Sequence, residues 1–173
     1  MKKDSEKEKE LFYSSKEIVK KNLISDSKVS VFYKSYHDSG NLKESLHFKK
    51  NKLEGVAIFY DENGKKLQRA MFKNNLLHGL MISYDNGKPI TSTTYLDGKE
   101  HGIRLIFAKN RNISAIMHYK FGKLNGMSTF FDEDKNKIRE ANYRDGELHG
   151  EVRNFHKNGL VISNESFQDG VKI

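Results

Sequence analysis

Tyr119-Lys-Phe-Gly122-Lys-Leu-Asn-Gly126-Met-Ser-Thr-Phe-Phe131 shows a pattern that occurs three times in this chain. An aromatic residue is followed by a glycine after three positions, by a second glycine after four more and by another aromatic residue after five more. The same pattern occupies residues 95–107 and 143–155. The stretch is therefore one unit of an internal repeat, and a repeat of this length is typical of an array built from one supersecondary unit.

Three series of residues extend the repeat over residues 29–173. Successive members of each series are 24 residues apart, except for one step of 23 in each. The first aromatic series is Phe48, Phe72, Tyr95, Tyr119, Tyr143 and Phe167. The second aromatic series is Tyr36, Tyr60, Tyr84, Phe107, Phe131 and Phe155, and the glycine series is Gly55, Gly79, Gly102, Gly126 and Gly150.

Each repeat contains two strand-like segments joined by a short turn. Residues 55–60 precede the turn Asp61-Glu-Asn-Gly64, and residues 66–72 follow it. Asn-Gly readily adopts the positive backbone angles that tight hairpins need, and short turns between consecutive strands give an antiparallel meander. The sequence therefore predicts an all-β repeat fold: an elongated single-layer antiparallel meander of about six β-hairpin repeats of ~24 residues.

Two of the turns lack the glycine. Arg111 and Lys135 stand at its position. Asparagine tolerates a left-handed backbone better than most residues, so we expect the neighbouring Asn110 and Asn136 to adopt that conformation instead.

Residues 1–28 form a separate charged segment without glycine. The spacing of Leu11, Phe12, Ile18 and Val19 brings them to one side of a helix, which predicts an N-terminal amphipathic α-helix over about residues 7–23. Two interpretations remain: the helix caps the end of the array, or it binds a partner or a membrane surface. Its polar side mixes glutamate and lysine, unlike a basic membrane-surface helix.

Period-two alternation assigns the two faces of the sheet. One face carries Val56, Ile58 and Tyr60 and their equivalents, and we expect the core there, including the second aromatic series. The opposite face carries a second apolar set, and an apolar patch on a thin sheet must be covered by the N-terminal helix, a partner, a second copy or lipid. This candidate partner-binding face consists of Tyr33, Phe59, Met81, Ile106 and Phe130.

The repeat resembles a known family. Tyr143-Arg-Asp-Gly-Glu-Leu-His-Gly150 followed by Phe155-His-Lys-Asn-Gly159 is similar to the bacterial MORN-repeat variant, many members of which are described as antitoxin components of the YwqK type. The resemblance covers about residues 29–173. It implies an elongated, twisted single-layer sheet of consecutive hairpins and a non-catalytic binding or scaffold role. The chain departs from the family at Asn51 and Asn75, where the family prefers glycine.

Composition excludes several classes of site. The chain has no cysteine, so a thiolate metal site and a cysteine nucleophile are excluded. The net charge is +8, but the lysines are scattered among acids, which indicates a solvated surface and no nucleic-acid partner. No stretch has the length of a membrane span. Charged residues follow Met1 instead of an apolar stretch, which indicates a cytoplasmic protein unless an export signal has been removed.

The residue types that carry chemistry occur in repeat positions. His78, His101 and His149 each precede a loop glycine, and we interpret them as turn histidines rather than metal ligands. The acidic segment 132–136 starts like a calcium loop, but Lys137 and Tyr143 stand where glycine and glutamate are needed. No motif predicts catalysis, a metal or another cofactor.

Two functions follow from these patterns. The first is a non-enzymatic scaffold or protein–protein interaction module, such as an antitoxin-like binder of a partner protein. The alternative is an exported cell-envelope structural or lipid-associated repeat protein; the net charge permits binding to membrane lipid, but scattered lysines do not favour it. The sequence leaves open the partner, the oligomeric state and the physiological process.

Overall fold

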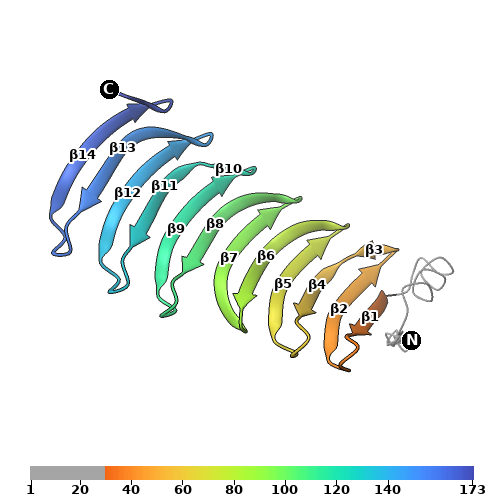
Figure 1. Cartoon of the computed structure of the whole chain (residues 1–173). Coiled ribbons are helices and arrows are strands. Elements are labelled where there is room, and N and C mark those ends of the chain that lie inside the picture. The colour runs from red at the N-terminus through yellow and green to blue at the C-terminus, as the bar shows by residue number, and fades with distance from the viewer. Residues whose placement is uncertain (1–29) are drawn as a thin grey trace, which may run out of the picture.

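The computed structural model describes residues 30–173, which form an all-β structure (Figure 1). The predicted N-terminal helix, with Leu11, Phe12, Ile18 and Val19, lies outside the described residues. The strands are β1 (Ser30–Tyr36), β2 (Leu42–Lys49), β3 (Lys52–Leu53), β4 (Gly55–Tyr60), β5 (Lys66–Lys73), β6 (Leu76–Asp85), β7 (Lys88–Leu96), β8 (Lys99–Phe107), β9 (Ile113–Lys120), β10 (Lys123–Leu124), β11 (Gly126–Phe131), β12 (Lys137–Arg144), β13 (Glu147–Phe155), β14 (Val161–Gln168) and β15 (Val171–Lys172).

All the strands belong to one open antiparallel sheet in which neighbours in the chain are neighbours in space. The short strand β3 pairs only with β2, and the short strand β10 pairs only with β9. A single residue separates each of them from the next strand, which is β4 or β11. Figure 1 shows a single curved layer that is much longer across the strands than along them. The predicted antiparallel meander is therefore confirmed. Within residues 30–173, no helix is long and apolar enough to cross a membrane.

The turns lie in two rows, one at each end of the strands. We call these rows the upper edge and the lower edge, as seen in Figure 1. Each upper-edge turn joins the second strand of one hairpin to the first strand of the next hairpin. Asp97-Gly98 is one of them, with φ of 49° and 82°, the two positive angles of a type I′ turn. Successive upper turns are bonded to one another: the Gly98 amide donates to the Leu77 carbonyl and the Gly122 amide to the Glu100 carbonyl, both at 2.8 Å. This contact repeats along the sheet and holds neighbouring hairpins in register.

The glycine-free turns at the lower edge differ from the prediction. Arg111 and Lys135 themselves have positive φ, of 71° and 69°, whereas Asn110 and Asn136 do not. The prediction that the asparagines take the left-handed conformation is therefore wrong. The physical reason is the turn's hydrogen bonding: the Arg111 amide donates to Ala108 and the Lys135 amide to Asp132, so the turn dictates the angle at that position whatever the residue.

The core is a line of small residues on one side of the sheet. Cross-strand partners share a face, and register places Ala57, Ala70, Thr93, Ala141 and Val152 on the same side, which we call the inner face. Each of these residues is at most 2% exposed. A single sheet has no second layer, so longer side chains of the same face must cover them.

The other side, the outer face, is more exposed. The sequence predicted the core there, and that prediction is wrong, because Leu80 and Ile103 are 36% and 45% exposed and Tyr36 is 56% exposed. Phe155 is an exception at 9% exposure, with the Lys137 ammonium 4.3 Å from the centre of its ring. Alternation along the strands correctly predicts which residues share a face. It does not predict which face is the core, because both faces carry apolar residues and only the burial of the side chains distinguishes the two faces.

Candidate functional site

One row of the inner face alternates aromatic residues with leucines. Register pairs each member of the first aromatic series with the residue that follows the next upper turn. The regular pairs are Phe48–Leu53, Phe72–Leu77, Tyr119–Leu124 and Tyr143–Leu148. Tyr95 instead faces Glu100, and Phe167 in the terminal repeat faces Lys172. Four residues later, Arg104 occupies the position that Ala57, Met81, Ser128 and Val152 hold in other repeats. A glutamate and an arginine therefore replace two core positions in one repeat.

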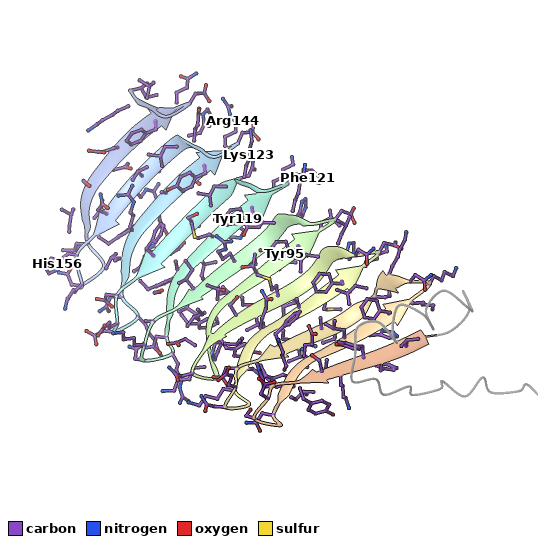
Figure 2. The ribbon with its side chains drawn as sticks, turned by 45° about the vertical axis from the view of Figure 1, so that its right-hand side comes forward. Tyr95, Tyr119, Phe121, Lys123, Arg144 and His156 are labelled. Atoms are coloured by element: carbon purple, nitrogen blue, oxygen red, sulfur yellow. The ribbon has the colours of Figure 1, made fainter. Side chains whose placement is uncertain are left out.

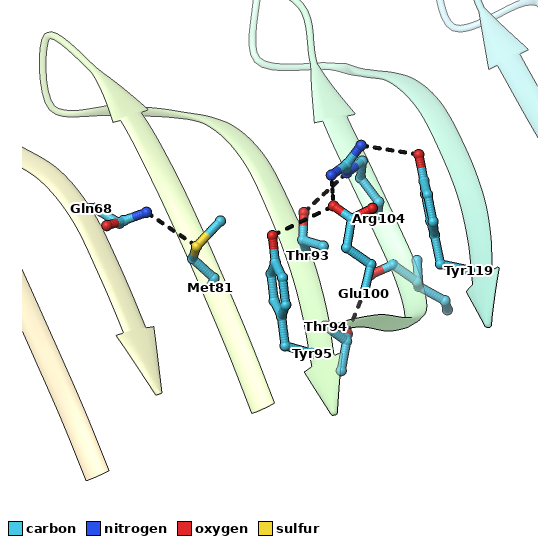
Figure 3. Close-up of polar contacts among 9 residues, drawn as sticks. Gln68, Met81, Thr93, Thr94, Tyr95, Glu100, Arg104 and Tyr119 are labelled. Carbon is cyan, nitrogen blue, oxygen red and sulfur yellow. Dashed lines mark hydrogen bonds and ion pairs between the residues drawn. The ribbon is translucent and has the colours of Figure 1, made fainter. Parts of the chain in front are cut away.

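These two residues join a polar cluster in the middle of the sheet (Figure 3). The Arg104 guanidinium forms an ion pair with the Glu100 carboxylate. It also donates from Nη1 to the Tyr119 hydroxyl at 3.0 Å and from Nε to Thr93 Oγ1 at 3.3 Å. The Tyr95 hydroxyl donates to Glu100 Oε1 at 3.5 Å. Five side chains from β7, β8 and β9 thus form one network on the inner face.

The cluster is half-buried but reachable. The side chains of Arg104 and Glu100 are 28% and 18% exposed. The guanidinium lies 4.8 Å from the centre of the Tyr119 ring, which is cation–π geometry. Tyr119 accepts from Arg104, so its own proton remains available for donation, and the carboxylate of Glu100 retains acceptor capacity. The site offers a donor, an acceptor and aromatic surface at one point, which suits recognition of a polar group.

The structure places all five predicted partner-binding residues on the inner face, but not in one patch. Ile106 faces Ala115, and Ala115 faces Phe130, so these three are contiguous. Phe59 is separated from them by polar residues in the same row, which are Gln68, Ser83 and Thr91. Met81 lies in the central row, where its sulfur is 3.1 Å from Gln68 Nε2, and Tyr33 is only 3% exposed.

Sequence reasoning missed Glu100 and Arg104. The signal was present, because superposing the repeats places Glu100 against four leucines and the terminal Lys172, and Arg104 against small or apolar residues. Alternation within one strand does not show it, since an isolated charge on a strand is normal. The comparison between repeats, combined with knowledge of the buried face, is what singles out the two residues.

The repeat-position histidines contact the turn of the next repeat. His78 Nδ1 is 3.1 Å from Asp97 Oδ1, and His149 Nδ1 is 3.3 Å from Asp169 Oδ1. His101 has no such acid, because Phe121 replaces it, and the two rings pack edge to face with centres 4.7 Å apart. Within residues 30–173, no group of three histidine, cysteine or acidic side chains is arranged to hold a metal ion.

The acidic turn at 132–136 is a hydrogen-bonded hairpin turn. Asp132 Oδ1 accepts from the amides of Asp134 and Asn136 at 3.0 and 2.8 Å. The hydrogen bond from the Asn136 side chain is the main cause that lowers the pKa of Asp132 below its ordinary value. The carboxylate is thus satisfied by the turn itself.

The pKa of Asp169 is also lowered, mainly by its hydrogen bond from Arg144 at 2.6 Å. We expect Arg144→Ala to raise the pKa of Asp169 toward its ordinary value of 3.8. A lowered pKa means that this pair stabilises the folded chain above the unfolded pKa and is lost as the pH falls through the folded one. Carboxyl NMR titration measures the shift. His149→Asn, which removes a smaller contribution, serves as the control, and an Asp169 pKa unchanged by Arg144→Ala contradicts the assignment.

Comparisons with known proteins give one family match. A family model described as "Periplasmic copper-binding protein (NosD)" matches residues 2–121. Comparison with curated proteins finds no match. The crystal structure of TarM is similar at 14% identity and a TM-score of 0.31, over 88% of this chain and 24% of that one. A mutant of S. aureus TarM in complex with fondaparinux, alpha-GlcNAc-glycerol and UDP has the same identity and coverage and a TM-score of 0.23. The chain spans about a quarter of the length of these structures.

Proposed function

This chain belongs to the family of periplasmic copper-binding proteins (NosD), and we propose that it is a non-enzymatic repeat scaffold that binds a partner protein through the inner face of its sheet. The observation that carries the proposal is the Glu100–Arg104 pair. A hydrophobic replacement of a half-buried ion pair is often at least as stable, so we expect that the pair is not needed to hold the sheet together. Its place between two tyrosines suits specific recognition.

The neighbouring apolar residues support the same surface. Ile106 and Phe130 lie half-buried on the inner face beside the polar cluster: Ile106 is on β8 with Arg104, and Phe130 is on β11, the strand next to β9. Interfaces commonly combine aromatic and arginine anchors with an apolar surround. We propose that the inner face from β7 to β11 is the contact surface, and that the narrower antitoxin-like role is binding of a toxin-like partner.

The side chains in residues 30–173 do not form the ligand set expected of a copper site. Copper sites in proteins use histidine, cysteine and methionine ligands in convergent sets. The chain has no cysteine, and its histidines at 78, 101 and 149 are directed to separate turns. Residues 30–173 hold no group of three histidine, cysteine, aspartate or glutamate side chains that could hold a metal ion. The residues there do not fit the metal in the family's description.

The finer architecture is also a proposal. We infer that the sheet consists of about six MORN-like hairpin repeats of ~24 residues, preceded by an amphipathic helix over about residues 7–23. The repeated upper-edge hydrogen bond supports the hairpin as the repeating unit. Circular dichroism of the full chain and of a variant lacking residues 1–28 tests the helix, because its removal should abolish the helical signal.

Two adjacent residues of β7 provide a matched test of the binding face. Thr91 points to the inner face opposite Ile106, and Ser92 points to the outer face opposite Leu105. Affinity capture from the source organism with the full chain identifies the partner. We expect Thr91→Arg to abolish capture, because it adds a large charged side chain to the contact surface, and Ser92→Arg to leave it intact. Equal capture by both folded variants rules out the inner face.

An exported cell-envelope or lipid-associated protein is the second candidate. The family description, which names the periplasm, favours it. Reading the gene ahead of residue 1 and fractionating cells that express the native gene test the location. Recovery of the protein only from the cytoplasmic fraction contradicts export.

A further inference from the structure

The fold gathers lysines that are scattered in the sequence onto one edge. The first four upper turns carry exposed lysines at or beside their tips. These are Lys49, Lys50, Lys52, Lys73, Lys99, Lys120 and Lys123. Within residues 30–173, none of them forms a salt bridge. Most of these lysines occupy two positions that recur about every 24 residues, and the sheet brings them together in one basic row.

The row is linear and rigidly spaced. The Asn75 amide donates to Leu53, the Gly98 amide to Leu77 and the Gly122 amide to Glu100, so each turn is tied to the one before it. Successive upper turns are two strands apart, which corresponds to about 10 Å. Lys49, Lys50 and Lys52 also line a hollow with Glu54 and Asn74 at the start of the row. An extended ligand following the edge would meet a positive charge at every turn.

The acids of this stretch have partners of their own. Glu54 Oε2 accepts from the Asn74 amide at 2.9 Å, and Asp97 Oδ1 contacts His78 Nδ1 at 3.1 Å. Beyond Lys123 the edge changes character, because Arg144 pairs with Asp169 and is accompanied by Asp145 and Glu147. The basic row therefore has a defined end.

Phe121 stands at that end and departs from the repeat. It occupies the first turn position, where other repeats have Lys50, Asn74, Asp97, Asp145 and Asp169. Its φ is 49°, a conformation unfavourable for a bulky residue, and it is 56% exposed. Figure 2 shows Phe121, Lys123 and Arg144 at the upper edge and His156 at the opposite one. Leu76, 48% exposed, adds a second apolar side chain to the row.

We propose that the upper edge from β2 to β10 binds an extended acidic segment of a partner protein that carries an apolar side chain near Phe121. This inference rests on the proposed binding function and adds a second contact to it. Apolar side chains among the lysines fit a polypeptide better than a phosphodiester chain. A flat anionic membrane would also approach Asp145, Glu147 and Asp169 on the same edge, whereas a segment ends where the acids begin.

Fluorescence anisotropy with the full chain tests the proposal. The probe is a labelled oligoglutamate peptide with one leucine near one end, at low and at physiological salt. We expect Lys73→Ser/Lys99→Ser/Lys120→Ser to weaken binding about tenfold, because each exposed charge pair contributes modestly. The matched control is Lys88→Ser/Lys109→Ser/Lys157→Ser at the lower edge, which removes the same charge and should change affinity less than about twofold.

A single substitution tests the contribution of the Phe121 ring to peptide binding. Phe121→Asn places in the turn a residue that Asn74 already represents at φ 52°, so the fold is retained. It should weaken binding of the leucine-containing peptide about threefold and leave a pure oligoglutamate unaffected. If the two triple lysine variants lose the same affinity for the peptide, the proposal that the upper edge binds it is wrong. If the chain binds anionic vesicles or an oligonucleotide more tightly than the peptide, and Lys73→Ser/Lys99→Ser/Lys120→Ser loses that binding, the ligand of the upper edge is not a polypeptide. Thr91→Arg leaves peptide binding unchanged, so failure of the inner face and failure of the edge are distinguishable.

Discussion

Glu100→Leu is expected to destabilise the sheet by about 1–3 kcal/mol, whereas Glu100→Leu/Arg104→Met is expected to be as stable as the natural chain or more so. The single change leaves a half-buried guanidinium without its carboxylate. The double change installs leucine, as at Leu77 and Leu124, and methionine, as at Met81. Urea unfolding at constant m-value measures both differences in free energy of unfolding.

The double-mutant cycle for Glu100 and Arg104 also requires the single variant Arg104→Met. That variant leaves the Glu100 carboxylate with Tyr95 only and should also lose about 1–3 kcal/mol. If the double variant is less stable than the natural chain, the pair holds the sheet together and its role is structural. If the double variant folds well but no longer captures the partner, the pair acts in recognition. The prediction therefore separates stability from binding at the same two residues.

Gly126→Ala is expected to cost about 2–3 kcal/mol, because it combines an unfavourable backbone angle with crowding. Gly126 has a φ of 103°, and a Cβ there would lie 3.4 Å from the Cβ of His118. The glycine permits the strand to bend beside the upper turn, where the sheet register shifts. Thermal and urea unfolding should both show the loss, because the change destabilises the hairpin and its contact with β9.

Gly122→Asn is the matched control, four residues earlier. Gly122 also has a positive φ, of 88°, but nothing lies within 4 Å of its Cβ position. Asn51 and Asn75 hold the equivalent position at φ of 61° and 70°. We expect a loss below about 1 kcal/mol, since asparagine tolerates left-handed angles. Equal losses at Gly122 and Gly126 would contradict the prediction that the position of Gly126 is the less tolerant of the two.

The fold was more predictable than the site. The spacing of Gly126, Tyr119 and Phe131 predicted strands, turns and meander correctly, because hairpins depend on residues near in sequence. The left-handed residues at 111 and 135 were predicted wrongly, since the hydrogen-bonded turn, and not the residue's preference, determines the angle there. The apolar set Phe59, Ile106 and Phe130 was placed on one face, but its interruption by polar residues depended on register.

The residues of a single repeat are enough to predict a repeated antiparallel hairpin array, because each turn and each alternating strand is encoded within that repeat. Which face is buried follows only from the assembled sheet, since both faces carry apolar residues and burial depends on the curvature and covering of the whole sheet. The assembled sheet also brings Tyr95, Glu100, Arg104 and Tyr119 together and places distant lysines in one row. Such contacts join residues of different repeats, and the register between strands creates them.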